Sequence, residues 1–165
     1  MEQIINLLYF LHRACATLVL KSSFRYFGKG AKVGMPRRIK NAKNIHIGES
    51  VSIQKDCWLF CCDEKLNSEI YISEHSSIGF GCALISMKRV SIGKSVLIAD
   101  NVHITDNSFE IADLQRPIKD QGLKLIKEVS IGDNSWIGTN VVIIGAHIGK
   151  HCVVGANSFV NKDFP

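Results

Sequence analysis

Residues 103–110, HITDNSFE, gather side chains that could carry out proton transfer. The imidazole of His103 can accept a proton near neutral pH, because the unperturbed pKa of histidine is about 6.5. Asp106 and Glu110 could act in the same way if desolvation raised the pKa of their carboxyl groups. His103 and Asp106 are therefore candidate catalytic residues, and the alternatives are an ordinary surface or interface histidine and a turn or acceptor-contact carboxylate.

Other reactive side chains give weaker signals. His147 and His151 are four residues apart, a spacing that would pair them for a metal on a helix. The six cysteines contain no CxxC pair and no cluster with histidine at zinc spacing; they are Cys15, Cys57, Cys61, Cys62, Cys82 and Cys152. We therefore predict free thiols and no metal site, and, without a cleavable signal peptide, a cytoplasmic protein.

A repeat of six residues must position these side chains. Four ten-residue segments align without gaps: IHIGESVSIQ from Ile45, IYISEHSSIG from Ile70, VSIGKSVLIA from Val90 and VSIGDNSWIG from Val129. An aliphatic residue at every sixth position fits neither a helix, with its period of 3.6, nor a simple alternating strand. It predicts the hexapeptide repeat of an all-β fold, a parallel β-helix, in which a corner separates His147 from His151.

The repeat also assigns a direction to each side chain. The aliphatic residue points into the core, and a small residue four positions later is predicted to do so too. These small inward residues are Val51, Cys57, Ser76, Cys82, Val96, Val102, Ser108, Ser135, Val141, Cys152 and Ser158. Three cysteines are thereby predicted to be core residues rather than catalytic thiols. His103 and Phe109 take equivalent outward positions on successive faces, and we expect these faces to diverge.

The spacing of equivalent isoleucines locates the loops. The distances along the chain between Ile47, Ile72, Ile92 and Ile131 are 25, 20 and 39 residues. A coil of three hexads needs about 18 residues, so a short excursion is predicted at 61–69 and a long one at 107–128. Ile143 and Ile148 are one residue short of a hexad, which predicts a tightened corner. Loops held by a rigid scaffold are common places for function.

Residues 1–30 lack the repeat and are predicted to form a separate amphipathic helix with a basic segment, ahead of a β-helix domain at 31–165. Apolar residues at helical spacing predict about five turns; they are Ile4, Leu7, Leu8, Leu11, Cys15 and Leu18. His12 and Arg13 interrupt this run, so it is not a clean transmembrane span.

The N-terminal part of the chain is strongly basic. Residues 1–48 contain nine Lys and Arg residues and one acid, Glu2, whereas the whole chain carries a net charge of +5. The helix is therefore expected either to pack on the body or to bring residues 1–43 to the inner face of an anionic membrane. Nucleic acid is not a predicted partner, because no aromatic interleaving or known binding module accompanies the basic residues.

The hexads, with GDNSWIGTNVVI, GKHCVVGANSFVNKD and RPIKDQGL, resemble the left-handed β-helix acyltransferases. Within that family they are similar to the O-acetyltransferases of bacterial capsule and lipopolysaccharide synthesis, relatives of maltose and galactoside acetyltransferases. The resemblance covers about residues 45–165. It implies a homotrimer that binds acetyl-CoA between subunits and acetylates a carbohydrate acceptor, either a sugar or a lipid-linked glycan. The base it implies is a histidine of the long excursion.

The resemblance also implies cofactor-binding residues. Trp136 of SWIG is expected to line the pantetheine and acceptor end of the groove, beside Gly138 and Thr139. The stretch VGANS resembles the segment whose backbone faces the CoA arm, and it contains Gly155, Ala156, Asn157 and Ser158. Lys162 of VNKD resembles a lysine near the CoA phosphates. The alternative for VGANS is that it is simply another hexad.

The usual catalytic histidine of the family is absent. Relatives commonly read ITDNSH or SDHNH, so that Asn107 and Phe109 of this chain occupy the histidine positions. Phenylalanine cannot accept a proton, and general-base catalysis is typically worth about 100- to 10,000-fold in rate. Two alternatives stay open: another base such as His103 or Asp106 acts, or the chain is a catalytically impaired trimeric homologue that keeps the CoA groove.

Overall fold

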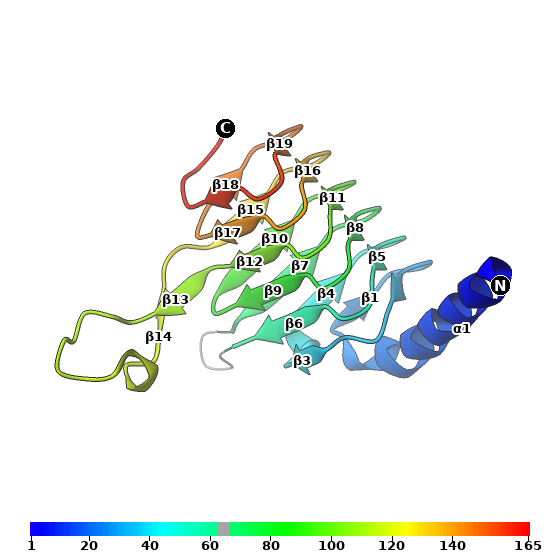
Figure 1. Cartoon of the computed structure of the whole chain (residues 1–165), viewed down its shortest axis with the longest axis horizontal. Coiled ribbons are helices and arrows are strands. Elements are labelled where there is room, and N and C mark those ends of the chain that lie inside the picture. The colour runs from blue at the N-terminus through cyan, green and yellow to red at the C-terminus, as the bar shows by residue number, and fades with distance from the viewer. Residues whose placement is uncertain (63–66) are drawn as a thin grey trace.

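The computed structural model describes residues 1–62 and 67–165, without the side chains of residues 5 and 6. Its body is a left-handed parallel β-helix whose coils stack away from the N-terminal helix α1 (Figure 1). Each full coil adds one strand to each of three parallel sheets, here named A, B and C, and each sheet has six described strands. The predicted all-β hexapeptide-repeat solenoid is confirmed.

The strands are short because each hexad contributes only one straight segment. Sheet A contains β1 (Tyr26–Phe27), β4 (Ile45–Ile47), β7 (Glu69–Ile72), β10 (Arg89–Ile92), β15 (Val129–Ile131) and β18 (His147–Ile148). Sheet B contains β2 (Lys32–Val33), β5 (Ser52–Ile53), β8 (Ser77–Ile78), β11 (Leu97–Ile98), β16 (Trp136–Ile137) and β19 (Val153–Val154). Sheet C contains β3 (Arg38–Lys40), β6 (Trp58–Cys61), β9 (Ala83–Ser86), β12 (His103–Thr105), β17 (Val142–Ile144) and β20 (Phe159–Val160).

The register of sheet A confirms the equivalences drawn from the repeat. Ile47 pairs with Ile72, Ile72 with Ile92, and Ile92 with Ile131. All four side chains are buried, as are the corresponding aliphatic residues of sheets B and C. Burying one such side chain stabilises the fold by about 1.5–3 kcal/mol, so the stacked aliphatic rows hold the coils together.

Most of the predicted small inward residues are buried, including Val51, Cys57 and Cys82. The cysteines at positions 15, 57, 61, 82 and 152 are free thiols, as predicted. A hydrogen bond with Cys82, together with burial, raises the pKa of Cys57, which fits an inert core thiol. Cys152 is only half-buried. The prediction for Ser108 is wrong, because the chain has already left the coil there and the side chain is exposed.

The long excursion at 107–128 is confirmed and forms an antiparallel hairpin that projects from the solenoid (Figure 1). Its strands are β13 (Asn107–Phe109) and β14 (Leu123–Leu125), and a short 3-10 helix, η3 (Ile118–Asp120), lies between them. The predicted tight corner between Ile143 and Ile148 is made by Gly145, whose φ is 58°. In the short excursion, residues 63–66 lie outside the described residues.

The N-terminal helix α1 (Glu2–Leu20) has the predicted length and continues into η1 (Lys21–Ser23), whereas η2 (Ala42–Asn44) precedes β4. α1 packs on the first coils through Tyr9, Arg13 and Thr17. The Thr17 hydroxyl donates to the Val33 carbonyl oxygen at 3.1 Å, and Arg13 Nη2 donates to Ser52 Oγ at 2.6 Å. The packed face is therefore not the predicted apolar stripe.

That stripe is exposed on the outer side of α1, where Leu18 keeps 64% of its surface accessible. The solenoid itself begins at β1, with Tyr26 paired to His46, slightly before the predicted boundary at residue 31. The first coil lacks a clear hexad pattern in the sequence, so the repeat alone did not reveal it.

Candidate active site

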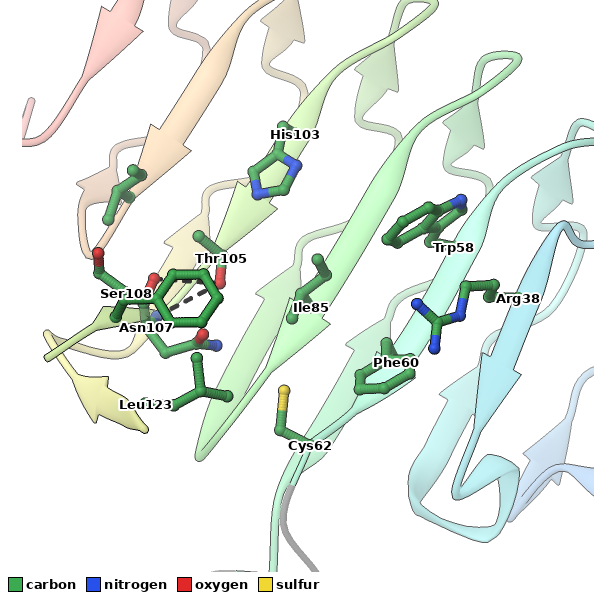
Figure 2. A pocket seen from close by; sticks show the side chains of 12 residues that line it. Arg38, Trp58, Phe60, Cys62, Ile85, His103, Thr105, Asn107, Ser108 and Leu123 are labelled. Atoms are coloured by element: carbon green, nitrogen blue, oxygen red, sulfur yellow. Dashed lines mark hydrogen bonds between the residues drawn. The ribbon is translucent and has the colours of Figure 1, made fainter. Parts of the chain in front are cut away.

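A groove of about 390 Å³ crosses the outer face of sheet C and ends at the hairpin (Figure 2). Its walls come from β3, β6, β9, β12, β13, β14 and β17, so the rigid solenoid and the excursion build it together. The lining residues are Arg38, Trp58, Phe60, Cys62, Ile85, His103, Thr105, Asn107, Ser108, Phe109, Leu123 and Ile144.

His103 and Phe109 both line this groove, so the expectation that they point apart is wrong. After Thr105 the chain leaves the coil and enters β13 instead of turning the usual corner. Phe109 pairs with Leu123 in the hairpin and remains 55% exposed at the groove. The position at which the resemblance implies a histidine and the nearest histidine in sequence therefore line one groove.

The imidazole of His103 is suited to accept a proton. Burial lowers the pKa of His103 below its usual value of 6.5, so the neutral ring dominates at pH 7. Its outward position on β12 is fixed by pairing with Ala83 on one side and Val142 on the other. The geometry gives a neutral base at the wall of a partly enclosed groove.

Asp106, the second candidate base, holds a structural position. Its carboxylate is completely buried and accepts backbone N–H bonds of 2.7 Å from three consecutive residues, Met87, Lys88 and Arg89. It also accepts a bond from Asn107 Nδ2 at 2.9 Å. These bonds occupy the oxygens of the carboxylate and satisfy the turn between β9 and β10, which favours a structural rather than a catalytic role.

Asn107 and Glu110 are also tied to neighbours. The Asn107 side chain lines the groove, but its amide is held by Asp106. Glu110 accepts backbone N–H bonds from Ile111 and Ala112, and these bonds, with Lys124 at 3.6 Å, lower the pKa of its carboxyl group. A carboxylate with a lowered pKa is a weaker base, which leaves His103 as the better candidate.

The predicted cofactor residues gather on a different part of the solenoid. Trp136 lies on the outer face of sheet B, where it is 49% exposed, and the chain turns the corner to sheet C directly after it. Gly138 stacks closely on Ala156, since a Cβ at Gly138 would lie 2.6 Å from the Ala156 nitrogen. Asn157 N–H donates to the Thr139 carbonyl oxygen at 2.9 Å.

The two predicted CoA-contacting stretches are thus neighbours on one edge of the solenoid, between sheets B and C. Gly155 and Ser158 belong to the same corner and are joined by a 2.7 Å hydrogen bond from the serine hydroxyl to the glycine carbonyl oxygen. Lys162 follows β20 and is exposed. None of the eight predicted cofactor residues lines the groove that holds His103.

Arg38, Trp58 and Phe60 are groove residues that sequence reasoning missed. The Arg38 guanidinium lies 5.2 Å from the ring centre of each aromatic residue (Figure 2). The alternation in WLFC was a usable signal, because it places Trp58 and Phe60 on one face of β6. What the sequence alone lacked was the pairing of β6 with β3.

No group of three or more His, Cys, Asp or Glu residues suited to a metal ion occurs in the described part of the chain. His147 and His151 contact different neighbours. The Nδ1 atom of His147 lies 2.7 Å from Ser130 Oγ, and the Nε2 atom of His151 lies 3.3 Å from Asn134 Nδ2. The spacing of four therefore does not bring them together as a metal pair.

Comparisons with known proteins agree with this architecture. Residues 128–162 match the family model described as the hexapeptide repeat of succinyl-transferase. A protein of Escherichia coli named "Putative lipopolysaccharide biosynthesis O-acetyl transferase WbbJ" is 31% identical over 140 residues, which are 81% of this chain and 70% of that protein. The chain spans about half the length of the first curated relatives it matches.

Solved structures show the same fold. A maltose O-acetyltransferase from Clostridium difficile is 30% identical, with a TM-score of 0.58 over 89% of this chain and 64% of that one. AntD, an N-acyltransferase from Bacillus cereus solved with dTDP-4-amino-4,6-dideoxyglucose and coenzyme A, is 20% identical, with a TM-score of 0.73 over 90% and 79%. Because of its repeats, the strand register between its coils and these relatives, the chain belongs to the hexapeptide-repeat acyltransferase family.

Proposed function

We propose that the protein is an acetyl-CoA-dependent O-acetyltransferase that acts on a sugar or lipid-linked glycan of surface polysaccharide synthesis. The single observation that carries this proposal is the neutral His103 in the same groove as Phe109, which takes the position of the family histidine. The relatives named as acetyltransferases of galactosides and of lipopolysaccharide biosynthesis support the substrate class.

In this proposal the acceptor hydroxyl gives its proton to a ring nitrogen of His103. The hydroxyl oxygen attacks the carbonyl carbon of the acetyl thioester, the carbon–sulfur bond breaks, and the imidazolium returns the proton to the CoA thiolate. The products are the acetylated sugar and free CoA. The groove wall at His103, Thr105 and Asn107 supplies a partly dry setting for this transfer.

The edge between sheets B and C, where the predicted cofactor residues lie, is called the cofactor edge here. It supports acetyl-CoA as the acetyl donor. Trp136, Gly138, Thr139, the VGANS corner and Lys162 are proposed to contact the cofactor, in the arrangement implied by the family. Gly155, Ala156 and Asn157 of this corner are exposed, which leaves it accessible to a long, flexible ligand. AntD is crystallised with coenzyme A, which agrees with this proposal for a protein of the same fold.

We propose a homotrimer in which this edge lies beside the groove of another copy. Sheet B supports such an assembly, because Leu97, Trp136 and Val153 lie in register and all three side chains are exposed. An exposed apolar row of this kind is typical of an interface. Sedimentation equilibrium should give a trimer, and Leu97→Asp should shift it towards the monomer; a monomeric wild-type protein would reject this part of the proposal.

The test of the activity is the release of free thiol from acetyl-CoA in the presence of candidate sugars. We expect acceptor-dependent release above the hydrolysis of acetyl-CoA by the protein alone. The alternative is a catalytically impaired subunit that keeps the CoA groove, and it is favoured by Phe109 and Asn107 in the family's histidine positions. Calorimetric binding of CoA without any acceptor-dependent thiol release would establish that alternative.

We further propose that α1 holds the protein at the cytoplasmic face of a membrane. By length and composition α1 with η1 could cross a bilayer. However, hydrogen bonds of Arg13 and Thr17 hold one side of the helix against the solenoid. The rest of its surface exposes apolar side chains, which suits a helix lying in the plane of the interface; they are Ile4, Leu7, Leu8, Phe10, Leu11, Leu18 and Val19.

The basic residues that follow α1 favour anionic lipids. Wild-type protein should float with vesicles that contain phosphatidylglycerol, and a double variant, Leu8→Asp with Leu11→Asp, should remain in the soluble fraction. The same double variant should keep its groove, because neither leucine contacts it. Equal flotation of the two proteins would reject the membrane contact.

A further inference from the structure

The groove has two chemically different ends, and only one of them is explained by acetyl transfer. Successive strands of sheet C place Arg38, Trp58, Ala83 and His103 in one column, each paired with the next. With neighbouring strands about 4.8 Å apart, Arg38 lies about 14 Å from His103 along this column. The proposed base therefore stands at one end of an elongated site and an arginine at the other.

The Arg38 end combines positive charge with aromatic surface. The guanidinium of Arg38 lies 5.2 Å from the ring centres of both Trp58 and Phe60, and Lys40 Nζ lies 5.3 Å from the ring centre of Phe60. Arg38 makes no ion pair with any carboxylate in residues 1–62 and 67–165. Contact with two rings orients the planar guanidinium, whose N–H donors can then bind a ligand.

The described lining of the groove contains no carboxylate. Asp106 lies behind the wall with its oxygens occupied by backbone N–H groups, and Glu110 is paired with Lys124. Among the described residues, the positive charges of Arg38 and of the nearby Lys40 favour an anion at that end. Phosphate oxygens match the fork of an arginine side chain especially well.

The space between the two ends suits a sugar ring. Ala83 is the smallest residue of the column and lies between Trp58 and His103, so the column itself places no large side chain at the middle of the face. A Trp58 ring at its edge offers an apolar surface for the C–H face of a pyranose, and His103 beyond it can reach a hydroxyl. Figure 2 shows the Trp58 and Phe60 rings on the side of the groove opposite the hairpin.

We propose that the groove takes its acceptor as a glycosyl diphosphate, with the diphosphate on Arg38 and Lys40 and the sugar ring between Trp58 and His103. This inference rests on the proposed function, because it assigns the substrate class of the same site. A sugar nucleotide and a sugar carried on a prenyl diphosphate share this chemistry. Neither the base nor the cofactor edge requires a phosphate on the acceptor, so the inference adds a separate requirement.

The kinetic test compares three forms of one hexose: nucleoside-diphosphate-linked, farnesyl-diphosphate-linked and free. Arg38→Gln should raise KM for the diphosphate-linked acceptor about ten-fold, with kcat and the KM for acetyl-CoA unchanged. Turnover of the free hexose should not change. The diphosphate form that wild-type protein prefers then identifies a nucleotide or a lipid as the carrier.

The matched control is Arg89→Gln, since Arg89 is exposed on sheet A and lies away from the groove. It should leave all three KM values unchanged. An equal loss for free and diphosphate-linked hexose in Arg38→Gln would overturn the inference. So would a raised KM for acetyl-CoA, because it would place the CoA phosphates at Arg38.

A binding measurement separates this inference from the proposed function. Thymidine diphosphate and farnesyl diphosphate are titrated into wild-type, Arg38→Gln and Arg89→Gln protein by calorimetry, without acetyl-CoA. Binding of either compound that weakens about ten-fold in Arg38→Gln alone supports the site even if no acceptor is acetylated. Failure of both compounds to bind wild-type protein overturns the inference, whether or not acetyl transfer occurs.

Discussion

The outer faces of sheets A and C each carry a histidine whose pKa is lowered by burial, yet their surroundings are opposite. On sheet A, His46 is stacked between Tyr26 and Tyr71, with ring centres 4.5 and 3.9 Å away. Burial, and secondarily the charge of Arg25, lowers its pKa. On sheet C, His103 has only burial as its cause and borders an open groove.

This difference shows that a lowered pKa alone does not identify a base. His46 has no space for a ligand against either ring face, and its buried Nδ1 finds no partner among the described residues. His103 combines a neutral ring with room for an acceptor. The geometry around each imidazole, rather than its pKa, distinguishes a packing residue from a catalytic candidate.

The sharpest test of the comparison replaces each of the two histidines in turn. His103→Gln should lower kcat about 100- to 10,000-fold, because the variant keeps a polar side chain but loses the base. His46→Phe keeps a ring in the tyrosine stack and should leave kcat within about two-fold of wild type. Thiol release from acetyl-CoA measures both, and similar rates for the two variants would remove His103 from the mechanism.

The next largest effect is expected on folding stability, at the turn between β9 of sheet C and β10 of sheet A. Asp106→Ala should lower the free energy of unfolding by about 3–5 kcal/mol, since the N–H groups of Met87, Lys88 and Arg89 lose their acceptor. Asp120→Ala, in the exposed hairpin, should cost less than about 0.5 kcal/mol. Urea denaturation measures both, and an equally small cost for Asp106→Ala would contradict its structural role.

A variant with increased activity would test the role of Phe109 in the groove on sheet C. Phe109→His places an imidazole at the family position, and we expect kcat to rise about ten-fold, because a second base then faces the same groove. Phe109→Leu serves as the control, since it opens the same space without adding a base. If both variants raise kcat equally, Phe109 limits access to the groove and not proton transfer.

The smallest expected effect is the contribution of His46, on sheet A, to the pH dependence of folding stability. The pKa of His46 is lower in the folded than in the unfolded chain, so the unfolded state binds more protons. Stability from this group is therefore present above pH 6.5 and is lost as the pH falls towards the folded pKa. Thermal unfolding between pH 7.5 and 5 should show a smaller acid loss for His46→Phe than for wild type.

The coils were predictable from sequence, because each buried isoleucine repeats the same contact in the next coil. The pairs Ile47 with Ile72 and Ile92 with Ile131 followed from the hexad alone, even across the long excursion. The tight corner at Gly145 followed from a missing residue. Nearest-neighbour stacking makes a solenoid locally determined, so a short pattern is sufficient to fix it.

The site was less predictable, because it lies where the hexad rule stops. The rule placed Ser108 inside and turned Phe109 away from His103, but the chain leaves the coil after Thr105. Asp106 looked like a free carboxylate because the turn that it binds lies on the preceding coil. The apolar stripe of α1 predicted a helix, but only Tyr9, Arg13 and Thr17 showed which side packs.

The hairpin leaves and re-enters the solenoid at a single point. The N–H of Ile126 donates to the carbonyl oxygen of Asp106 at 2.8 Å, so the two ends of the excursion are fastened together at its base. Everything between them can change in length or composition while the stacked rows of isoleucine stay intact. In an evolving lineage, new acceptor preferences could thus arise by exchanging this hairpin, without any alteration to the tube that carries it.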